Sequence, residues 1–250
     1  MQIQRQTIDY FHADLRMTGY LADGSDASGK APGVLLAHEA PGLSVLMHQR
    51  ADALAELGYV AFALDLHGSI GFNQAESRRR HAELMETPFL IRDRAIAALD
   101  VLVSQSRVDP GRIGAVGFCQ GGITVMELAR ARASIRCAIG FHPGLKRPNA
   151  TPEGPIDARV MMMVGSEDPL APADDRAAFA AEMAAAGAAW EMHLFGGVQH
   201  AFTNVGIERL GLAGFHYDAR ATRRSWAMML DMLDEVLACG PILQPEHSLP

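Results

Sequence analysis

The spacing of hydrophobic residues changes near residue 30, and this change separates two predicted kinds of structure. Between residues 7 and 23 polar and apolar residues alternate, as in strands with one exposed face, and the turn-rich segment 24–29 follows. We therefore expect an antiparallel hairpin at the N-terminus. After residue 32 the apolar residues instead come in short unbroken runs, which are typical of strands covered on both faces.

Apolar runs and helical periodicities then alternate along the chain. The predicted buried strands are residues 33–37, 59–64, 112–118, 135–141, 159–165 and 190–195. The predicted helices are residues 43–57, 91–105, 123–131, 173–187 and 221–238. Because strand and helix alternate without a linker or an internal repeat, the pattern predicts one α/β domain over residues 1–250. Its sheet is expected to be mostly parallel and covered by helices on both faces.

Two segments interrupt this alternation. Residues 69–88 are polar and rich in arginine, including Arg78, Arg79 and Arg80. We interpret these arginines as a solvated helix face, with positive charge supplied to a site beneath them as the alternative. Residues 240–250 contain three prolines, so we expect a loosely packed tail there.

The composition excludes several classes of protein. The hydrophobic fraction is 49% and the mean hydropathy is +0.05, and no apolar run approaches the ~20 residues that a membrane-spanning helix needs. The first residues lack the basic-then-apolar layout of a signal peptide, so a cytoplasmic location is expected. The net charge of −7 disfavours nucleic acid as a partner and leaves a small molecule as the expected one.

The cysteines and the common motifs predict neither a metal nor a cofactor. The three cysteines are far apart, which gives no disulfide framework and no CxxC site. Cys137 lies in an apolar stretch and is expected to be a small buried hydrophobe, whereas Cys239 receives no role. The HExxH, GxGxxG and P-loop motifs are all missing.

The third cysteine, Cys119, lies in the most informative string of the chain. Residues 117–122 read GFCQGG, and here a strand must turn directly into a helix. Glycines on both sides of a reactive residue are typical of a nucleophile elbow, in which the turn is too tight for neighbouring side chains. A helix starting near Gly121 would point its N-terminal amides at the sulfur and favour the thiolate. We therefore predict that Cys119 is a nucleophile.

Asp168 and His200 supply the partners that such a nucleophile needs. Each follows a predicted strand, at residues 159–165 and 190–195, so each is expected on a loop at the carboxyl edge of the sheet. The chain order of nucleophile, acid and histidine is the one associated with this kind of turn. The pattern predicts a triad in which His200 takes or holds the thiol proton of Cys119 and Asp168 fixes the tautomer.

The predicted chemistry is acyl transfer through a thioester, followed by hydrolysis. The tetrahedral oxyanion would need two hydrogen-bond donors. Their positions predict the backbone N–H of Gln120, directly after the nucleophile, and that of Ala40, in the loop after the strand 33–37.

Glu39 lies in the same loop and is unusual beside a thiol, because a carboxylate disfavours ionisation of a neighbouring cysteine. The residues alone leave two interpretations: a carboxylate paired with solvent or arginine, and a functional group. His38 either orients Glu39 or simply packs. His142 follows the strand 135–141 and is a candidate for the pocket lining.

Together, these motifs resemble the dienelactone hydrolase family of α/β-hydrolases over about residues 8–238. The matching features are GFCQGG, the Glu39 loop, the string GSED that ends at Asp168, and HAF beginning at His200. The resemblance implies an α/β-hydrolase fold, hydrolysis of a small ester or lactone, and Cys119 with these two residues as the triad. It also implies that Glu39 gates the nucleophile by contacting the resting thiol and accepting its proton when substrate arrives.

One position departs from the resemblance. Family members that act on carboxylate-bearing dienelactones carry an arginine four residues after the histidine, where this chain has Asn204. A neutral amide does not replace a bidentate guanidinium. We therefore expect a substrate other than a carboxylated dienelactone.

Three alternative functions remain open from the sequence. The first is a general carboxylesterase or thioesterase of the same fold. The second is a non-catalytic scaffold, which a complete predicted triad disfavours. The third is a redox sensor based on oxidation of Cys119, which is disfavoured because no second cysteine lies within a few residues.

Overall fold

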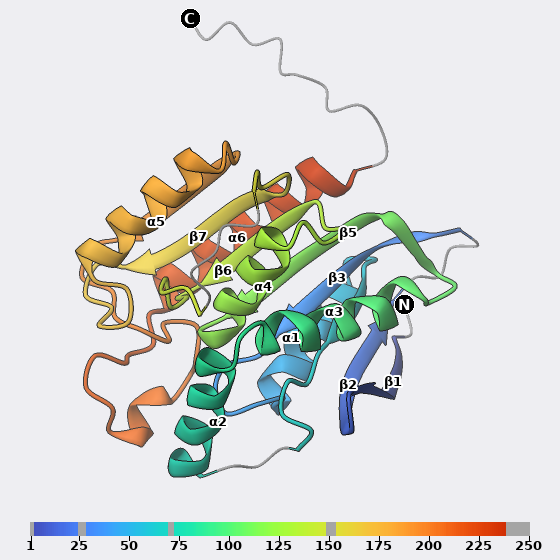
Figure 1. Cartoon of the computed structure of the whole chain (residues 1–250), viewed down its shortest axis with the longest axis horizontal. Coiled ribbons are helices and arrows are strands. Elements are labelled where there is room, and N and C mark those ends of the chain that lie inside the picture. The colour runs from blue at the N-terminus through green and yellow to red at the C-terminus, as the bar shows by residue number, and fades with distance from the viewer. Residues whose placement is uncertain (1–2, 25–28, 70–72, 149–153, 239–250) are drawn as a thin grey trace, which may run out of the picture.

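Eight strands form one mixed sheet in the computed structural model, which describes residues 3–24, 29–69, 73–148 and 154–238 (Figure 1). The strands are β1 (Gln4–His12), β2 (Leu15–Asp23), β3 (Ala31–Ala37), β4 (Val60–Ala63), β5 (Val108–Phe118), β6 (Cys137–Phe141), β7 (Arg159–Gly165) and β8 (Trp190–Phe195). Their spatial order is β1-β2-β4-β3-β5-β6-β7-β8. The pairs β1–β2 and β2–β4 are antiparallel and all others are parallel, which confirms the predicted α/β fold.

The N-terminal hairpin is confirmed, but its reversal lies earlier than the turn-rich segment. Strands β1 and β2 pair from Gln4 opposite Asp23 to His12 opposite Leu15. The chain therefore reverses at Ala13 and Asp14, where Ala13 has a φ of 48°. The continuous alternation of the sequence hid this turn, because a two-residue reversal hardly disturbs a period of two.

Helices connect the strands and cover both faces of the sheet. They are α1 (Val45–Ala55), α2 (Gln74–Glu86), α3 (Leu90–Val103), α4 (Gln120–Arg130), α5 (Ala173–Ala185), α6 (Ala219–Leu237) and the short 3₁₀ helix η1 (Ile207–Leu210). Side chains of Ser44, Asn73 and Asp218 cap the N-termini of α1, α2 and α6. Helix α2 occupies the arginine-rich interruption.

Two apolar clusters lie on opposite faces of the sheet. Helices α2 to α5 pack on one face and α1 and α6 on the other; in Figure 1, α3 and α4 lie in front of the sheet and α6 behind it. The methionines of β7 illustrate the alternation, since Met162 belongs to the first cluster and Met161 and Met163 to the second. Cys137 is fully buried in the second cluster, as predicted, and burial raises the pKa of its thiol to about 12.

The parallel strands bring six loops to one edge of the sheet. Strands β3, β4, β5, β6, β7 and β8 run in the same direction, so the segments after each of them meet at their carboxyl ends. This edge receives every residue that the sequence nominated for catalysis. Cys239 and the tail 240–250 lie outside the described residues, and no described helix is long and apolar enough to cross a membrane.

Candidate active site

The turn from β5 into α4 accepts no side chains at its glycines. An ideal Cβ on Gly117 would lie 1.9 Å from the carbonyl oxygen of Gly121, and one on Gly121 would lie 2.1 Å from the carbonyl oxygen of Ala37. Cys119, at the corner, has a φ of 53°, which is strained for a residue with a side chain. It precedes the first residue of α4, so the helix N-terminus faces its partly exposed sulfur.

The loops after β7 and β8 bring Asp168 and His200 together. His200 Nδ1 lies 2.8 Å from Asp168 Oδ2, and both side chains are inaccessible to solvent. The other carboxylate oxygen of Asp168 accepts a hydrogen bond of 2.8 Å from the N–H of Leu170. The carboxylate therefore fixes the imidazole with Nδ1 protonated and with Nε2 directed away from it.

His200 and Cys119 interact through their charges. Burial lowers the pKa of His200, but the negative charge of Cys119 and the hydrogen bond to Asp168 outweigh it and raise that pKa to about 10. Its Nε2 is buried, and a side-chain interaction with Cys119 also raises the pKa of His200. A thiol beside an imidazole is the arrangement from which a cysteine can become a strong nucleophile at neutral pH.

Two buried histidines hold the loop that follows β3. His38 accepts a hydrogen bond at Nε2 from the N–H of Leu66, so its Nδ1 carries the proton and donates to the carbonyl of Glu39 at 2.6 Å. His67 Nε2 bonds the carbonyl of Ala40 at 3.2 Å, and burial lowers the pKa of His67 to about 3. This contact with the Glu39 backbone supports the first of the two roles considered for His38, which is to orient the Glu39 loop.

The two predicted oxyanion donors lie on adjoining segments. Gln120 begins α4, and the contact between Gly121 and the end of β3 places that helix start against the loop of Ala40. Among the described residues, neither the N–H of Gln120 nor that of Ala40 has a recorded acceptor. Both are therefore available to a ligand, as an oxyanion hole requires.

Glu39 is held by two neighbours. Its Oε1 lies 3.4 Å from Nη1 of Arg50, and its Oε2 accepts a hydrogen bond of 2.7 Å from Nδ2 of Asn204. Arg50 comes from α1 and is only 6% exposed. The Glu39 carboxylate forms its hydrogen bonds with Arg50 and Asn204. The contact between Glu39 and the thiol of Cys119 therefore stays a prediction.

Sequence reasoning missed Arg50, although the sequence carried a signal for it. Arg50 follows Met47 by three residues and precedes Leu54 by four, so it lies on the apolar stripe of α1. A charged residue in such a stripe is buried and needs a partner of opposite charge. That reasoning would have connected Arg50 to an unassigned acid such as Glu39.

His142 packs against the ring of His200. Its fully buried ring packs edge-on against His200 with 5.1 Å between centroids, and its Nε2 lies 2.8 Å from Oγ1 of Thr203. Like Cys119 and Ala201, it is a non-glycine residue with positive φ, so three strained positions surround this site. The structure thus places His142 as support for His200.

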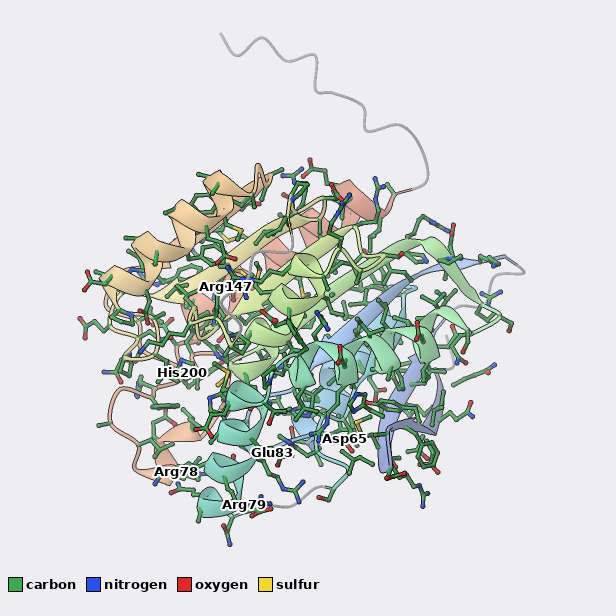
Figure 2. The ribbon with its side chains drawn as sticks, in the orientation of Figure 1. Asp65, Arg78, Arg79, Glu83, Arg147 and His200 are labelled. Atoms are coloured by element: carbon green, nitrogen blue, oxygen red, sulfur yellow. The ribbon has the colours of Figure 1, made fainter. Side chains whose placement is uncertain are left out.

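Helix α2 contacts the first residue of α4 through His81. His81 Nδ1 lies 2.7 Å from Oε1 of Gln120. Arg79 is exposed and pairs with Glu76, while Arg80 bonds the same glutamate. Figure 2 shows Arg78 and Arg79 along the outer part of α2, with His200 nearer the sheet.

The described side chains include no cluster of three or more His, Cys, Asp or Glu that would ligate a metal. The groups at the strand edge are instead a thiol, an imidazole paired with a carboxylate, and backbone N–H groups. This set suits reactions in which a carbonyl is attacked and its oxygen becomes an anion.

Comparison with known sequences identifies relatives of this chain. The sequence model of the Dienelactone hydrolase family matches residues 17–237. A "Probable 2-oxo-3-(5-oxofuran-2-ylidene)propanoate lactonase" of Bradyrhizobium sp is 28% identical over 70% of this chain and 75% of its own length. The "Carboxymethylenebutenolidase" of Pseudomonas putida is also 28% identical, over 61% of this chain and 67% of its own.

Comparison with solved structures also identifies a dienelactone hydrolase-like protein as similar to this chain. The dienelactone hydrolase-like promiscuous phosphotriesterase P91, obtained from metagenomic libraries, superposes with a TM-score of 0.90. Its sequence is 33% identical, and the match covers 94% of this chain and 98% of P91.

Proposed function

Because the chain belongs to the dienelactone hydrolase family of α/β-hydrolases, we propose that it hydrolyses a small carboxylic ester or lactone through a Cys119–His200–Asp168 triad. The contact between Asp168 and His200, together with the effect of the Cys119 charge on His200, carries this proposal. The remaining alternatives within this chemistry are a general carboxylesterase and a thioesterase. Small-molecule binding and a cytoplasmic location stay predictions.

In the proposed reaction, the thiolate of Cys119 attacks the substrate carbonyl carbon and forms a C–S bond. The carbonyl π electrons move to oxygen, and the N–H groups of Gln120 and Ala40 stabilise that oxyanion. When the intermediate collapses, the C–O bond to the alcohol breaks, and protonated His200 delivers its Nε2 proton to the leaving oxygen. His200 then removes a proton from water, which attacks the thioester and releases the acid and the thiolate.

The direct test compares wild type with Cys119→Ala and His200→Ala on a nitrophenyl ester. Loss of a nucleophile or its proton carrier is expected to lower kcat by at least about 10³-fold. Cys137→Ala is the matched control, because it removes a buried thiol outside the site. Turnover by Cys119→Ala equal to that of wild type would remove the nucleophile assignment.

The surroundings of Glu39 favour a substrate that is neutral next to its scissile bond. Asn204 brings no charge, and the buried guanidinium of Arg50 already contacts Glu39, Thr203 and Asn204. A substrate carboxylate would find no unengaged cation in this network. Arg78 is the exposed alternative on α2, three residues before His81 and therefore on the same face of the helix.

We predict that a carboxylated dienelactone is a poor substrate. Its kcat/KM is expected to be at least about tenfold lower than that of its own methyl ester, because no ion pair offsets desolvation of the anion. Steady-state kinetics on the two compounds measure the ratio. If the free acid is hydrolysed as fast as the methyl ester, the prediction is wrong. If Arg78→Ala then slows hydrolysis of the free acid alone, Arg78 binds the carboxylate.

The likeness to P91 supports a second candidate activity, hydrolysis of neutral phosphotriesters. The thiolate would attack phosphorus and expel an aryloxide, using the same donors for the developing charge on the phosphoryl oxygen. Water deprotonated by His200 would then attack phosphorus, break the P–S bond and release the dialkyl phosphate and the thiolate. Turnover of an aryl dialkyl phosphate that disappears in Cys119→Ala would support this activity. Its absence in wild type would restrict the site to carbonyl substrates.

A further inference from the structure

We propose that Arg50 is the positioning residue for Glu39, acting from helix α1 in place of a cation on the loop after His200. The proposal rests on the proposed function, because Glu39 matters here as a group beside the nucleophile. It assigns Arg50 no contact with substrate. Its role is to fix where the Glu39 carboxylate lies.

Both oxygens of Glu39 depend on the same guanidinium. Nη1 of Arg50 lies 3.4 Å from Oε1 of Glu39. Nη2 donates a hydrogen bond of 2.9 Å to Oδ1 of Asn204, whose Nδ2 in turn donates one of 2.7 Å to Oε2 of Glu39. Since Arg50 fixes the amide orientation of Asn204, it directs the second contact as well as the first. The carboxylate is therefore constrained in both position and plane.

Arg50 is itself fixed by the segments that carry the nucleophile and the histidine. Its guanidinium carbon lies 3.5 Å from the ring centroid of Phe118, the residue that precedes Cys119 in the chain. Nη2 also donates a hydrogen bond of 2.7 Å to Oγ1 of Thr203, three residues after His200. One buried side chain thus connects α1, the end of β5 and the loop after β8.

Electrostatics make this arrangement necessary for Glu39. The charged or titratable groups on the neighbouring elements include Arg50 on α1, His38 directly after β3, His67 after β4 and His142 after β6. The Glu39 side chain is only 17% exposed, and its ion pair among the described residues is the one with Arg50. Without that cation, the carboxylate would lose its partly buried partner and turn toward water, which removes a base from the site.

A double-mutant cycle tests whether Arg50 acts through Glu39. We expect Arg50→Met and Glu39→Gln each to lower kcat/KM for a neutral ester by about tenfold to a hundredfold, as for a misplaced active-site group. The combined Glu39→Gln/Arg50→Met variant is expected to match Glu39→Gln within about twofold, because the two changes remove the same interaction. Arg50→Lys should recover part of the loss, since it restores the charge but not the planar fork.

Arg130→Met is the matched control for the loss of a buried arginine. Arg130 lies at the far end of α4, where it pairs with Glu127 and Glu182. We expect this variant to lose stability in urea unfolding while its kcat/KM stays within about twofold of wild type. If Arg50→Met does not fold, the double variant still tests the proposal, because it buries no unpaired charge. Its kcat/KM is then compared with that of Glu39→Gln.

The alkylation rate of Cys119 by iodoacetamide, located by peptide mapping, separates this proposal from the proposed function, because it needs no turnover. We expect Arg50→Met and Glu39→Gln to change this rate alike, and Arg130→Met to leave it unchanged. The proposal is overturned if Arg50→Met keeps wild-type turnover and alkylation, or if the losses of the two single variants multiply in the double variant. Activity of Cys119→Ala would instead overturn the function and leave the alkylation result standing.

Discussion

At the scale of single residues, the site is governed by how burial and neighbouring charge compete at His200. Burial alone would leave its imidazole neutral at pH 7, but the charge of Cys119 and the hydrogen bond to Asp168 reverse this outcome and raise the pKa to about 10. A raised pKa means that the protonated form dominates below that pH. We therefore expect His200 to hold the proton that it later delivers to the leaving group.

This assignment predicts the pH dependence of His200. In NMR titrations of the imidazole rings, His200 is expected to keep its proton through pH 8 and to titrate near pH 10. Cys119→Ala removes the largest effect that raises this pKa, so its midpoint should move to lower pH. The kcat/KM of wild type should likewise fall as the pH rises through about 10, because His200 then loses the proton that the leaving group needs. A His200 signal already deprotonated at pH 7 in wild type would contradict the ion pair.

At the scale of elements, the turn between β5 and α4 decides whether a nucleophile can be presented at all. The turn closes only because Gly117 and Gly121 leave space for the backbone of each other and of β3. The strain at Cys119 is then maintained by the strand on one side and the helix on the other. Neither element would hold this geometry alone.

We predict that Gly117→Ala destabilises the protein by about 3 kcal/mol or more, because its Cβ would overlap backbone atoms that cannot move independently. The free energy of unfolding in urea, measured against wild type, gives the value. Gly196→Ala is the matched control, since its Cβ meets nothing within 4 Å, and it should stay within about 0.5 kcal/mol of wild type. Equal effects of the two substitutions would show that the turn is looser than its contacts indicate.

At the scale of the whole molecule, one sheet separates two apolar clusters and joins them. Every central strand contributes side chains to both faces, so neither cluster can lose its packing without exposing the strands that support the other. Ion pairs also join neighbouring helices on one face of the sheet: Arg130 on α4 lies 2.8 Å from Glu182 on α5. We therefore expect a single cooperative domain.

The two tryptophans provide a test of this expectation, because they report on opposite faces of the sheet. Trp190 packs edge-on against Phe179 in the first cluster, and Trp226 lies against Phe141 in the second. Urea unfolding of Trp190→Phe and Trp226→Phe, each followed by the remaining tryptophan and by circular dichroism, should give coincident midpoints from the two probes within each variant. Separate midpoints within one variant would show that the faces unfold independently.

Much of this architecture follows from local patterns. The continuous apolar runs predicted the parallel strands, and the glycines around Cys119 predicted the elbow, because both express constraints between residues close in sequence. The order of Cys119, Asp168 and His200 after strand ends was enough to nominate all three. The hairpin reversal at Ala13 and Asp14 was missed, since a uniform alternation contains no signal for where a ribbon folds back.

The sequence by itself determined the fold class, because strand period, turn sterics and parallel topology leave few arrangements, and it nominated the residues proposed for catalysis. Only the tertiary structure decided which charges meet. Asn204 alone indicated that a cation was missing, yet Arg50 reaches Glu39 from α1, far away in sequence. Electrostatic partners are chosen by distance in space and by burial, and neither quantity can be read from the order of residues along a chain.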